Sequence, residues 1–173
     1  VIPTKHGWHA LAGEGGHATL APADEREVEL LAILTRKFGH VSSERVLSGP
    51  GLVNLYHANC ELSGVAAHDL EPADITERAL GGSCDICTTV VDDFFAMLGT
   101  ATGNLVLTLG ARGGAYIGGG IVPRLAERIG ASRFRERFEA HGRLSDYLAD
   151  VPCYMVTAPY PALEGALASL SSV

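Results

Sequence analysis

Apolar side chains recur at helical spacing in the segment that follows Ser83. The positions that share one helical face are Cys84, Cys87, Val91, Phe94, Phe95 and Leu98. A helix with such a face packs it against other elements, because apolar surface is unfavourable in water. The segment therefore predicts a longer helix that lies buried in the protein.

Shorter helices are predicted ahead of this segment by their start and stop signals. Asp24 and Glu27 have the spacing of a capping box, and Gly39 is a stop signal for the helix that follows them. Further helix starts are predicted at Ser42 or Ser43, at Pro50, and at the capping-box pair Asp74 and Glu77.

The second half of the chain alternates between strand-like and helix-like segments. Two β-prone runs, 104–109 and Ala115–Ile117, are separated by glycines, and Pro123 then opens a helix. Helical sequence continues over 132–149, PCYMVT is a strand candidate, and PALEGALASL predicts a terminal helix. These elements indicate an α/β chain with few strands and, without a repeat or linker-like stretch, one domain.

Composition argues against some classes of function. Twenty acidic side chains against thirteen basic ones give a net charge of -7 without a Lys or Arg cluster, so no extended nucleic-acid interface is expected. No uncharged apolar run of about 18 residues occurs, and neither Met nor a charged leader segment opens the chain. Four scattered cysteines do not form a disulfide framework. We therefore expect a cytoplasmic protein that is not membrane-bound.

A carboxylate and an imidazole lie three residues apart in the glycine-rich stretch LAGEGGHATLAP. Glu14 accepts hydrogen bonds, His17 donates or accepts one, and Gly13, Gly15 and Gly16 let a ligand approach the main chain. This set suits neighbouring hydroxyls of a sugar or polyol. The spacing alone, however, favours a surface turn over such a site.

Three other short patterns leave their function open. Glu44 lies in the first turn of a predicted helix, where the helix dipole favours a carboxylate whatever its role. The glycine run 118–120, between a strand and a helix, fits either a nucleotide lying against the backbone or a tight strand-to-helix turn. Cys84 and Cys87 resemble half of a zinc site, but no second pair occurs at zinc-finger spacing, which favours core packing.

Four motifs resemble, in their order and spacing, the bacterial glucokinase family: GEGGHATLAP, GHVSSERVLSGPGLVNLY, DITERAL and GGAYIGGGIVPR. The resemblance covers nearly the whole chain and concerns the ATP-dependent type, since the Cys-x-Cys-Gly zinc motif of the distinct ROK sugar kinases is absent. It implies the α/β actin/hexokinase-like (ribonuclease H-like) phosphotransferase fold, in which two domains close over sugar and ATP. Residues 1–173 resemble most of the larger, C-terminal domain, a single partial domain without the smaller N-terminal one.

The same resemblance implies roles for individual residues. Glu14 and Glu44 would accept hydrogen bonds from glucose hydroxyls, and His17 would hold the anomeric end of the sugar. The family's general-base Asp and its phosphate loops correspond to sequence that this chain lacks, so the resemblance places no catalytic residue within it. The residues implied to lie beside the nucleotide are Gly118, Gly119 and Gly120.

We therefore expect a fragment of a glucokinase. The parent enzyme would transfer the γ-phosphoryl group of ATP, with Mg²⁺, to the 6-hydroxyl of glucose, giving glucose 6-phosphate at the entry to glycolysis. This chain alone is expected to be inactive, to pair as a homodimer by family resemblance, and to hold no metal ion of its own. Two alternatives stay open: another hexose kinase of the same fold, and a non-catalytic sugar-binding or dimerisation module.

Overall fold

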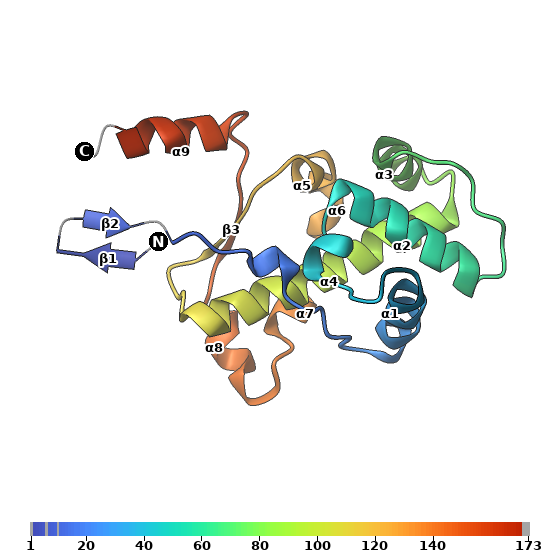
Figure 1. The fold of residues 1–173 in the computed structure, drawn as a ribbon, viewed down its shortest axis with the longest axis horizontal. Coiled ribbons are helices and arrows are strands. Elements are labelled where there is room, and N and C mark those ends of the chain that lie inside the picture. Colours follow the sequence, from blue (N-terminus) through green and yellow to red (C-terminus); the bar gives the residue numbers. More distant parts are fainter. Residues whose placement is uncertain (1, 6, 10, 171–173) are drawn as a thin grey trace.

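A computed structural model describes residues 2–5, 7–9 and 11–170, which are mostly helical (Figure 1). Strands β1 (Ile2–Thr4) and β2 (Gly7–His9) pair antiparallel, whereas β3 (Ala115–Ile117) and β4 (Cys153–Met155) pair parallel. The α-helices are α1 (Glu25–Phe38), α2 (Gly49–Leu62), α3 (Pro72–Leu80), α4 (Asp85–Leu109), α5 (Ile121–Arg124), α6 (Ala126–Ile129), α7 (Phe134–Glu139), α8 (Ser145–Ala149) and α9 (Pro161–Leu170). Short 3-10 helices are η1 (Gly15–His17), η2 (Ser43–Arg45) and η3 (Gly142–Leu144).

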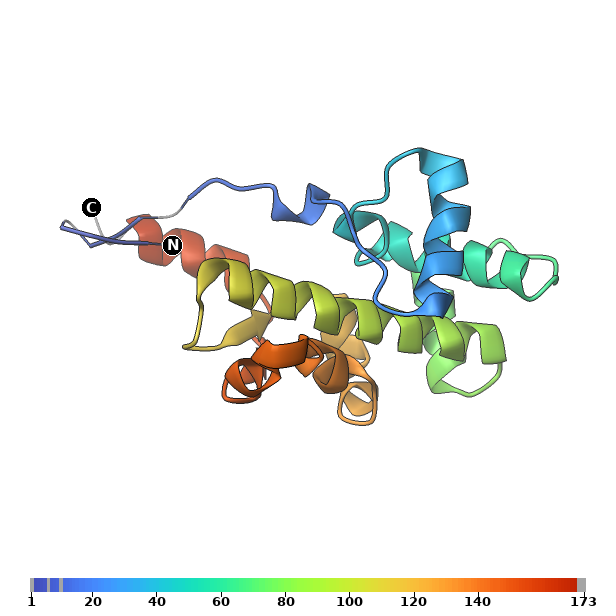
Figure 2. The ribbon, with the colours of Figure 1, turned by 90° about the horizontal axis from the view of Figure 1, so that it is seen from below.

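Helix α4 is the central helix of the structure, because several of the other helices pack against it. Its length confirms the long helix that the sequence predicted. Helices α2, α3, α7 and α8 pack against it, and α1 packs against α2. Figure 2 shows α1 on one side of α4 and the orange helices α7 and α8 on the other. Cys84 is the N-cap residue of α4, and Gly110 ends the helix in the left-handed region, with φ 62°.

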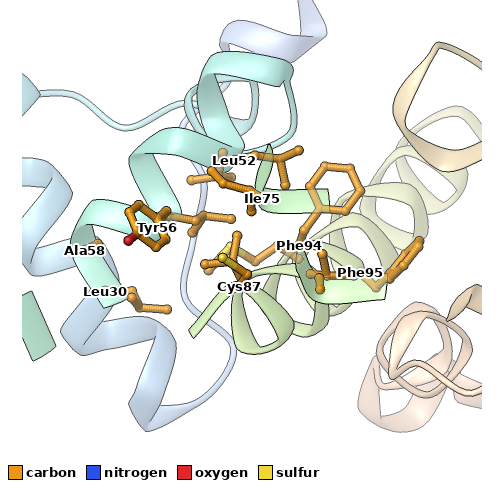
Figure 3. Close-up of a cluster of buried hydrophobic side chains, with 14 of the residues drawn as sticks. Leu30, Leu52, Tyr56, Ala58, Ile75, Cys87, Phe94 and Phe95 are labelled. Carbon is orange, nitrogen blue, oxygen red and sulfur yellow. The ribbon is translucent and has the colours of Figure 1, made fainter. Parts of the chain in front are cut away.

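The apolar core follows the face of α4 that the sequence indicated. Leu30 of α1, Leu52 of α2, Ile75 of α3 and Phe95 of α4 are each at most 1% exposed and meet in one cluster (Figure 3). Burying a side chain of this size contributes about 1.5–3 kcal/mol, so the cluster holds the four helices together. A second, smaller cluster joins the end of α4 to β3, α7 and α8, through Val106, Ala115, Phe138, Leu148 and Val151.

Among the described residues, α4 is also the one helix long and apolar enough to cross a membrane by length and composition. Its most apolar stretch, however, is 56% buried inside the protein. The helices packed against α4 cover this buried part of its apolar surface.

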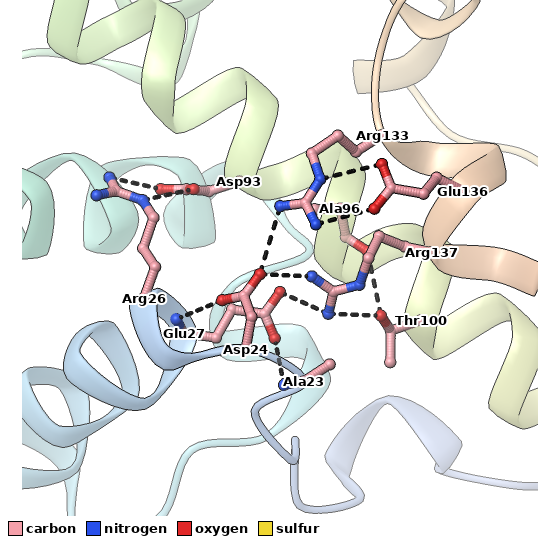
Figure 4. Close-up of polar contacts among 10 residues, drawn as sticks. All are labelled: Ala23, Asp24, Arg26, Glu27, Asp93, Ala96, Thr100, Arg133, Glu136 and Arg137. Carbon is pink, nitrogen blue, oxygen red and sulfur yellow. Dashed lines mark hydrogen bonds and ion pairs between the residues drawn. The ribbon is translucent and has the colours of Figure 1, made fainter. Parts of the chain in front are cut away.

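A buried ion-pair network fixes α1 and α7 against α4 (Figure 4). Arg137 of α7 is 4% exposed, and its Nη1 donates to Asp24 Oδ2 at 2.9 Å. Its Nη2 donates to Thr100 Oγ1 at 3.0 Å. The same nitrogen forms an ion pair with Glu27 Oε1 at 2.8 Å, but these two atoms are not aligned for a hydrogen bond. Because an unpaired buried charge is costly, these contacts define one arrangement of the three helices.

The strand expected over 104–109 is wrong, because this stretch is the last part of α4. Its β-prone residues adopt helix because helical spacing turns Val106 into the second apolar cluster, leaving Leu105 and Leu109 54% and 68% exposed. Thr108 Oγ1 donates to the Asn104 carbonyl one turn earlier, which satisfies its hydroxyl within the helix.

Three helical segments differ from their sequence signals. Helix α5 begins at Ile121, two residues before the predicted Pro123 start. The capping box of α3 consists of Glu71 and Asp74, so the N-cap residue is Glu71, three residues before the predicted Asp74, and the helix begins at Pro72. The helical stretch 132–149 is divided into α7, η3 and α8. Gly142, with φ 57°, lies in the interruption because few other residues tolerate that conformation.

Other expected elements are confirmed. Asp24 caps α1 by accepting from the Glu27 amide at 2.9 Å, and Gly39 ends that helix with φ 75°. β3, β4 and the terminal helix α9 lie where the sequence placed them. The β1–β2 hairpin and α9 extend from the same end of the helical body (Figure 1).

Candidate functional site

The two sugar-type motifs of the sequence meet in space. Backbone hydrogen bonds join Leu20 N to the Val41 carbonyl at 3.0 Å, and Ser43 N to the Ala18 carbonyl at 3.1 Å. These bonds lay the segment after η1 antiparallel to the segment before η2. As a result, the GEGGH and SSER motifs face each other.

His17 is the centre of the resulting cluster. Its Nε2 lies 3.0 Å from Glu44 Oε2 and 3.8 Å from Glu14 Oε2. All three side chains are more than half exposed, with fractions of 88% for Glu14, 62% for His17 and 56% for Glu44. The arrangement therefore offers acceptor oxygens and an imidazole to a ligand from solvent.

A hollow of about 320 Å³ adjoins this cluster, and its lining includes His17 and Glu44 but not Glu14. The other lining residues are Ser42, Arg45, Ser48, Pro50 and Asn54. Sequence reasoning assigned no ligand role to those polar side chains. In the sequence, all of these residues lie within the resemblance motif GHVSSERVLSGPGLVNLY, which covers η2 and the first turns of α2.

The start of α2 holds Glu44 in place. Ser48, the N-cap residue, accepts from the Gly51 amide at 3.0 Å while its own hydroxyl donates to the Glu44 carbonyl at 2.7 Å. Asn54 Nδ2 donates to the Arg45 carbonyl at 3.0 Å. A methyl group on Gly51 would lie 2.5 Å from the Val46 carbonyl oxygen, so only glycine permits this close approach.

The glycine run lies on the other side of the same helical turn. Gly118, Gly119 and Gly120 are exposed, and a methyl group on any of them would meet nothing within 4 Å. Gly119 has a φ of 106°, which disfavours other residues. Gly120 lines a second hollow, of about 220 Å³, together with Gly49, Leu52, Pro72, Ala73, Thr76, Ile121 and Arg124. The first turn of α2 thus borders both hollows.

The cysteine pair is only partly in the core. Cys87 is fully buried, whereas Cys84 is half-buried at the start of α4, with its sulfur accepting from the Cys87 amide at 3.4 Å. Over the described ranges 2–5, 7–9 and 11–170, no group of three or more His, Cys, Asp or Glu side chains is placed to hold a metal ion.

A carboxylate–imidazole cluster and an open glycine loop, at two hollows that share the first turn of α2, fit the phosphotransferase class with the actin/hexokinase-like fold. Within this class the chain belongs to the glucokinase family: the family model described as Glucokinase matches residues 1–173. Curated relatives agree. The chain is similar to a glucokinase from Chromobacterium violaceum, at 53% identity over 99% of the chain and 49% of the relative. A glucokinase from Paramagnetospirillum magneticum is 55% identical over 95% of the chain and 52% of the relative.

Solved structures agree on the fold. The crystal structure of a glucokinase from an Antarctic psychrotroph superposes with a TM-score of 0.91 at 40% identity, over 98% of this chain and 53% of that one. A glucokinase from Balamuthia mandrillaris, crystallised in complex with glucose, gives a TM-score of 0.77 at 21% identity over 90% of this chain and 45% of that one. The chain thus spans about half the length of the relatives it matches.

Proposed function

We propose that the protein containing this chain is an ATP-dependent glucokinase, and that this chain supplies part of its sugar site. The observation that carries the proposal is the contact of His17 with Glu44 beside a hollow of about 320 Å³. That volume lies at the lower end of the range for small-molecule sites. The glucose in the Balamuthia mandrillaris complex makes glucose the first sugar to test.

The proposed roles follow from hydrogen-bonding capacity. Glu44 and Glu14 accept hydrogen bonds from sugar hydroxyls, and hydrogen bonds to such charged acceptors are stronger than those to neutral ones. His17 binds the anomeric end and is oriented by Glu44 at 3.0 Å. A sugar that lacks one of these hydroxyls would leave a carboxylate unpaired, and such a loss discriminates strongly between substrates.

The glycine run is proposed to lie beside the nucleotide. The open space around Gly118, Gly119 and Gly120 fits a flat ligand placed directly against the main chain. ATP, when bound, supplies the phosphoryl group that is transferred. Mg²⁺ is proposed to be held through the ATP phosphates, because this ion binds substrate phosphates in kinase sites.

The remaining parts of the reaction are proposed to come from the rest of the family's length. The chain would form most of the larger, C-terminal domain, as a single partial domain. The general-base Asp for the 6-hydroxyl and the phosphate loops would belong to the part of the protein outside it. We also propose that the protein is cytoplasmic and homodimeric. Sedimentation of the full-length protein at micromolar concentration tests the dimer.

A sugar panel with the full-length protein tests the proposal. Phosphorylation of glucose, mannose, galactose, fructose and N-acetylglucosamine is followed by ADP release, and glucose is expected to give the highest kcat/KM. A higher value for another hexose would instead identify a different hexose kinase of this fold. Glucose binding without any ADP release, measured by calorimetry and coupled assay, would favour the non-catalytic sugar-binding module.

A further inference from the structure

Two cysteines lie in the first turn of α4, away from the proposed sugar site. Cys84 is the N-cap residue, and its sulfur accepts a hydrogen bond from the backbone amide of Cys87 at 3.4 Å. Residues three apart in a helical turn have Cα atoms about 5 Å apart, which is within the range that a disulfide spans.

The surroundings of Cys84 favour its thiolate. Burial acts to raise the pKa of Cys84, but hydrogen bonds from the Cys87 amide and thiol and the Ile86 amide, with the charge of Arg78, outweigh it and hold the pKa below its usual value. Thiolates at helix N-termini beside cationic groups are the reactive form of cysteine. The surface next to it is hollowed by about 390 Å³, with Arg78 and Ser83 in the wall.

Cys87 has the opposite character. It is fully buried in the main apolar cluster (Figure 3). Burial first, and then the hydrogen bond and charge of Cys84, raise the pKa of Cys87 to about 12. Two of these causes depend on a negative sulfur at Cys84, so they disappear once that sulfur is covalently capped.

We propose that Cys84 and Cys87 form a reversible dithiol–disulfide pair that exchanges with small-molecule disulfides such as oxidised glutathione. The Cys84 thiolate attacks one sulfur of the small disulfide, forming a mixed disulfide and expelling one thiolate. Cys87 gives its proton to this thiolate, directly or through water, and attacks the Cys84 sulfur, expelling the second thiolate, which takes up a proton from solvent. Two protein thiols are oxidised to a disulfide, and one small disulfide is reduced to two thiols.

Trypsin mapping of the full-length protein tests the pairing directly. Cleavage after Arg78 and Arg112 leaves both cysteines on one peptide, 79–112, while Cys60 and Cys153 fall on others. After equilibration in buffers of increasing oxidised glutathione, the 79–112 peptide is expected to lose two hydrogen atoms in mass and to regain them with dithiothreitol. The proposal is overturned if the disulfide joins Cys60 to Cys87, or if no disulfide forms while the protein is folded.

Variants test the order of attack. Cys87→Ser is expected to retain glutathione on Cys84 as a stable mixed disulfide, whereas Cys84→Ser should take up neither glutathione nor a disulfide in this turn. Cys153→Ser is the matched control, since Cys153 is also half-buried but burial raises its pKa. That variant should behave as the parent protein does.

The pH profile of alkylation provides a measurement that needs no change to either cysteine. Iodoacetamide should react with Cys84 faster than with Cys153 at pH 7. Replacing the exposed Arg78 by Gln should move the Cys84 profile to higher pH without unfolding the protein. Equal rates at the two cysteines would show that the surroundings of Cys84 do not activate it.

Discussion

His17 Nε2 and Glu44 Oε2 lie 3.0 Å apart, although they belong to separate motifs of the sequence. The contact depends on the antiparallel pairing of the two segments around Thr19 and Ser42. It also depends on the Ser48 hydroxyl, which holds the Glu44 carbonyl at 2.7 Å. The geometry of the site is therefore set by main-chain structure rather than by the exposed side chains themselves.

The first prediction concerns the charge of Glu44 in the full-length enzyme. Glu44→Gln keeps the shape of the side chain but exchanges a charged acceptor for a neutral one, so kcat/KM for glucose should fall by about 1.5–3 kcal/mol, or roughly 10- to 150-fold. The midpoint of thermal unfolding should change little, because Glu44 is 56% exposed. Glu29→Gln, an exposed change on α1, is the control and should leave both quantities unchanged.

Local signals in the sequence were enough for the parts of the fold that local chemistry determines. The Asp24 cap, the Gly39 stop and the apolar face of α4 follow from spacing and propensity. The run 104–109 was mispredicted because tertiary packing of Val106 outweighs the β-propensity of its neighbours. The resemblance gave roles to Glu14, His17 and Glu44, and the structure brings them together. Arg45 and Asn54 were missed because no local pattern shows that they line a hollow.

The second prediction concerns the buried ion pair between Arg137 and Glu27. Arg137→Met removes the cation and leaves the Glu27 carboxylate buried without its charge partner, which should lower the free energy of unfolding by about 3–5 kcal/mol. The double variant Glu27→Gln, Arg137→Met should recover part of this loss, since no buried charge remains. Urea denaturation measures both, and a single-variant loss below about 1 kcal/mol would contradict a structural role for the pair.

The third prediction is a pH dependence that arises from Asp24. Burial acts to raise the pKa of Asp24, but the Glu27 amide and the guanidinium groups of Arg133 and Arg137 outweigh it and lower the pKa. A lowered folded-state pKa contributes stability above the unfolded value of about 3.9, and this contribution is lost as the pH falls through the folded-state value.

Asp24→Asn isolates that contribution, because asparagine also caps helices well. The variant should be less stable than the parent protein at pH 7, and the difference should shrink as the pH falls below about 4. Urea denaturation between pH 7 and pH 3 provides the comparison. A difference that stays constant over this range would show that the charge of Asp24 does not stabilise the fold.

The fourth prediction concerns close packing between α4 and α7. A methyl group on Gly99 would overlap the carbonyl oxygen of Phe134, a backbone atom that cannot rotate away. Gly99→Ala should therefore cost about 1–3 kcal/mol in unfolding free energy, despite the better helix propensity of alanine. Gly165→Ala in α9 meets nothing within 4 Å and is the matched control, expected to be neutral or slightly stabilising.

The fifth prediction is that this chain alone does not phosphorylate glucose at a measurable rate, although Glu14, His17 and Glu44 already converge within it. Loss of a general base alone lowers rates by about 10²–10⁴-fold, and loss of domain closure also admits water and removes the positioning of ATP. The purified chain is assayed for ADP release with glucose and ATP at high concentration, with the full-length protein as the positive control. Glucose phosphorylation by the chain alone would mean that its own residues supply the base, and the proposed division of the site between this chain and the rest of the protein would then be wrong.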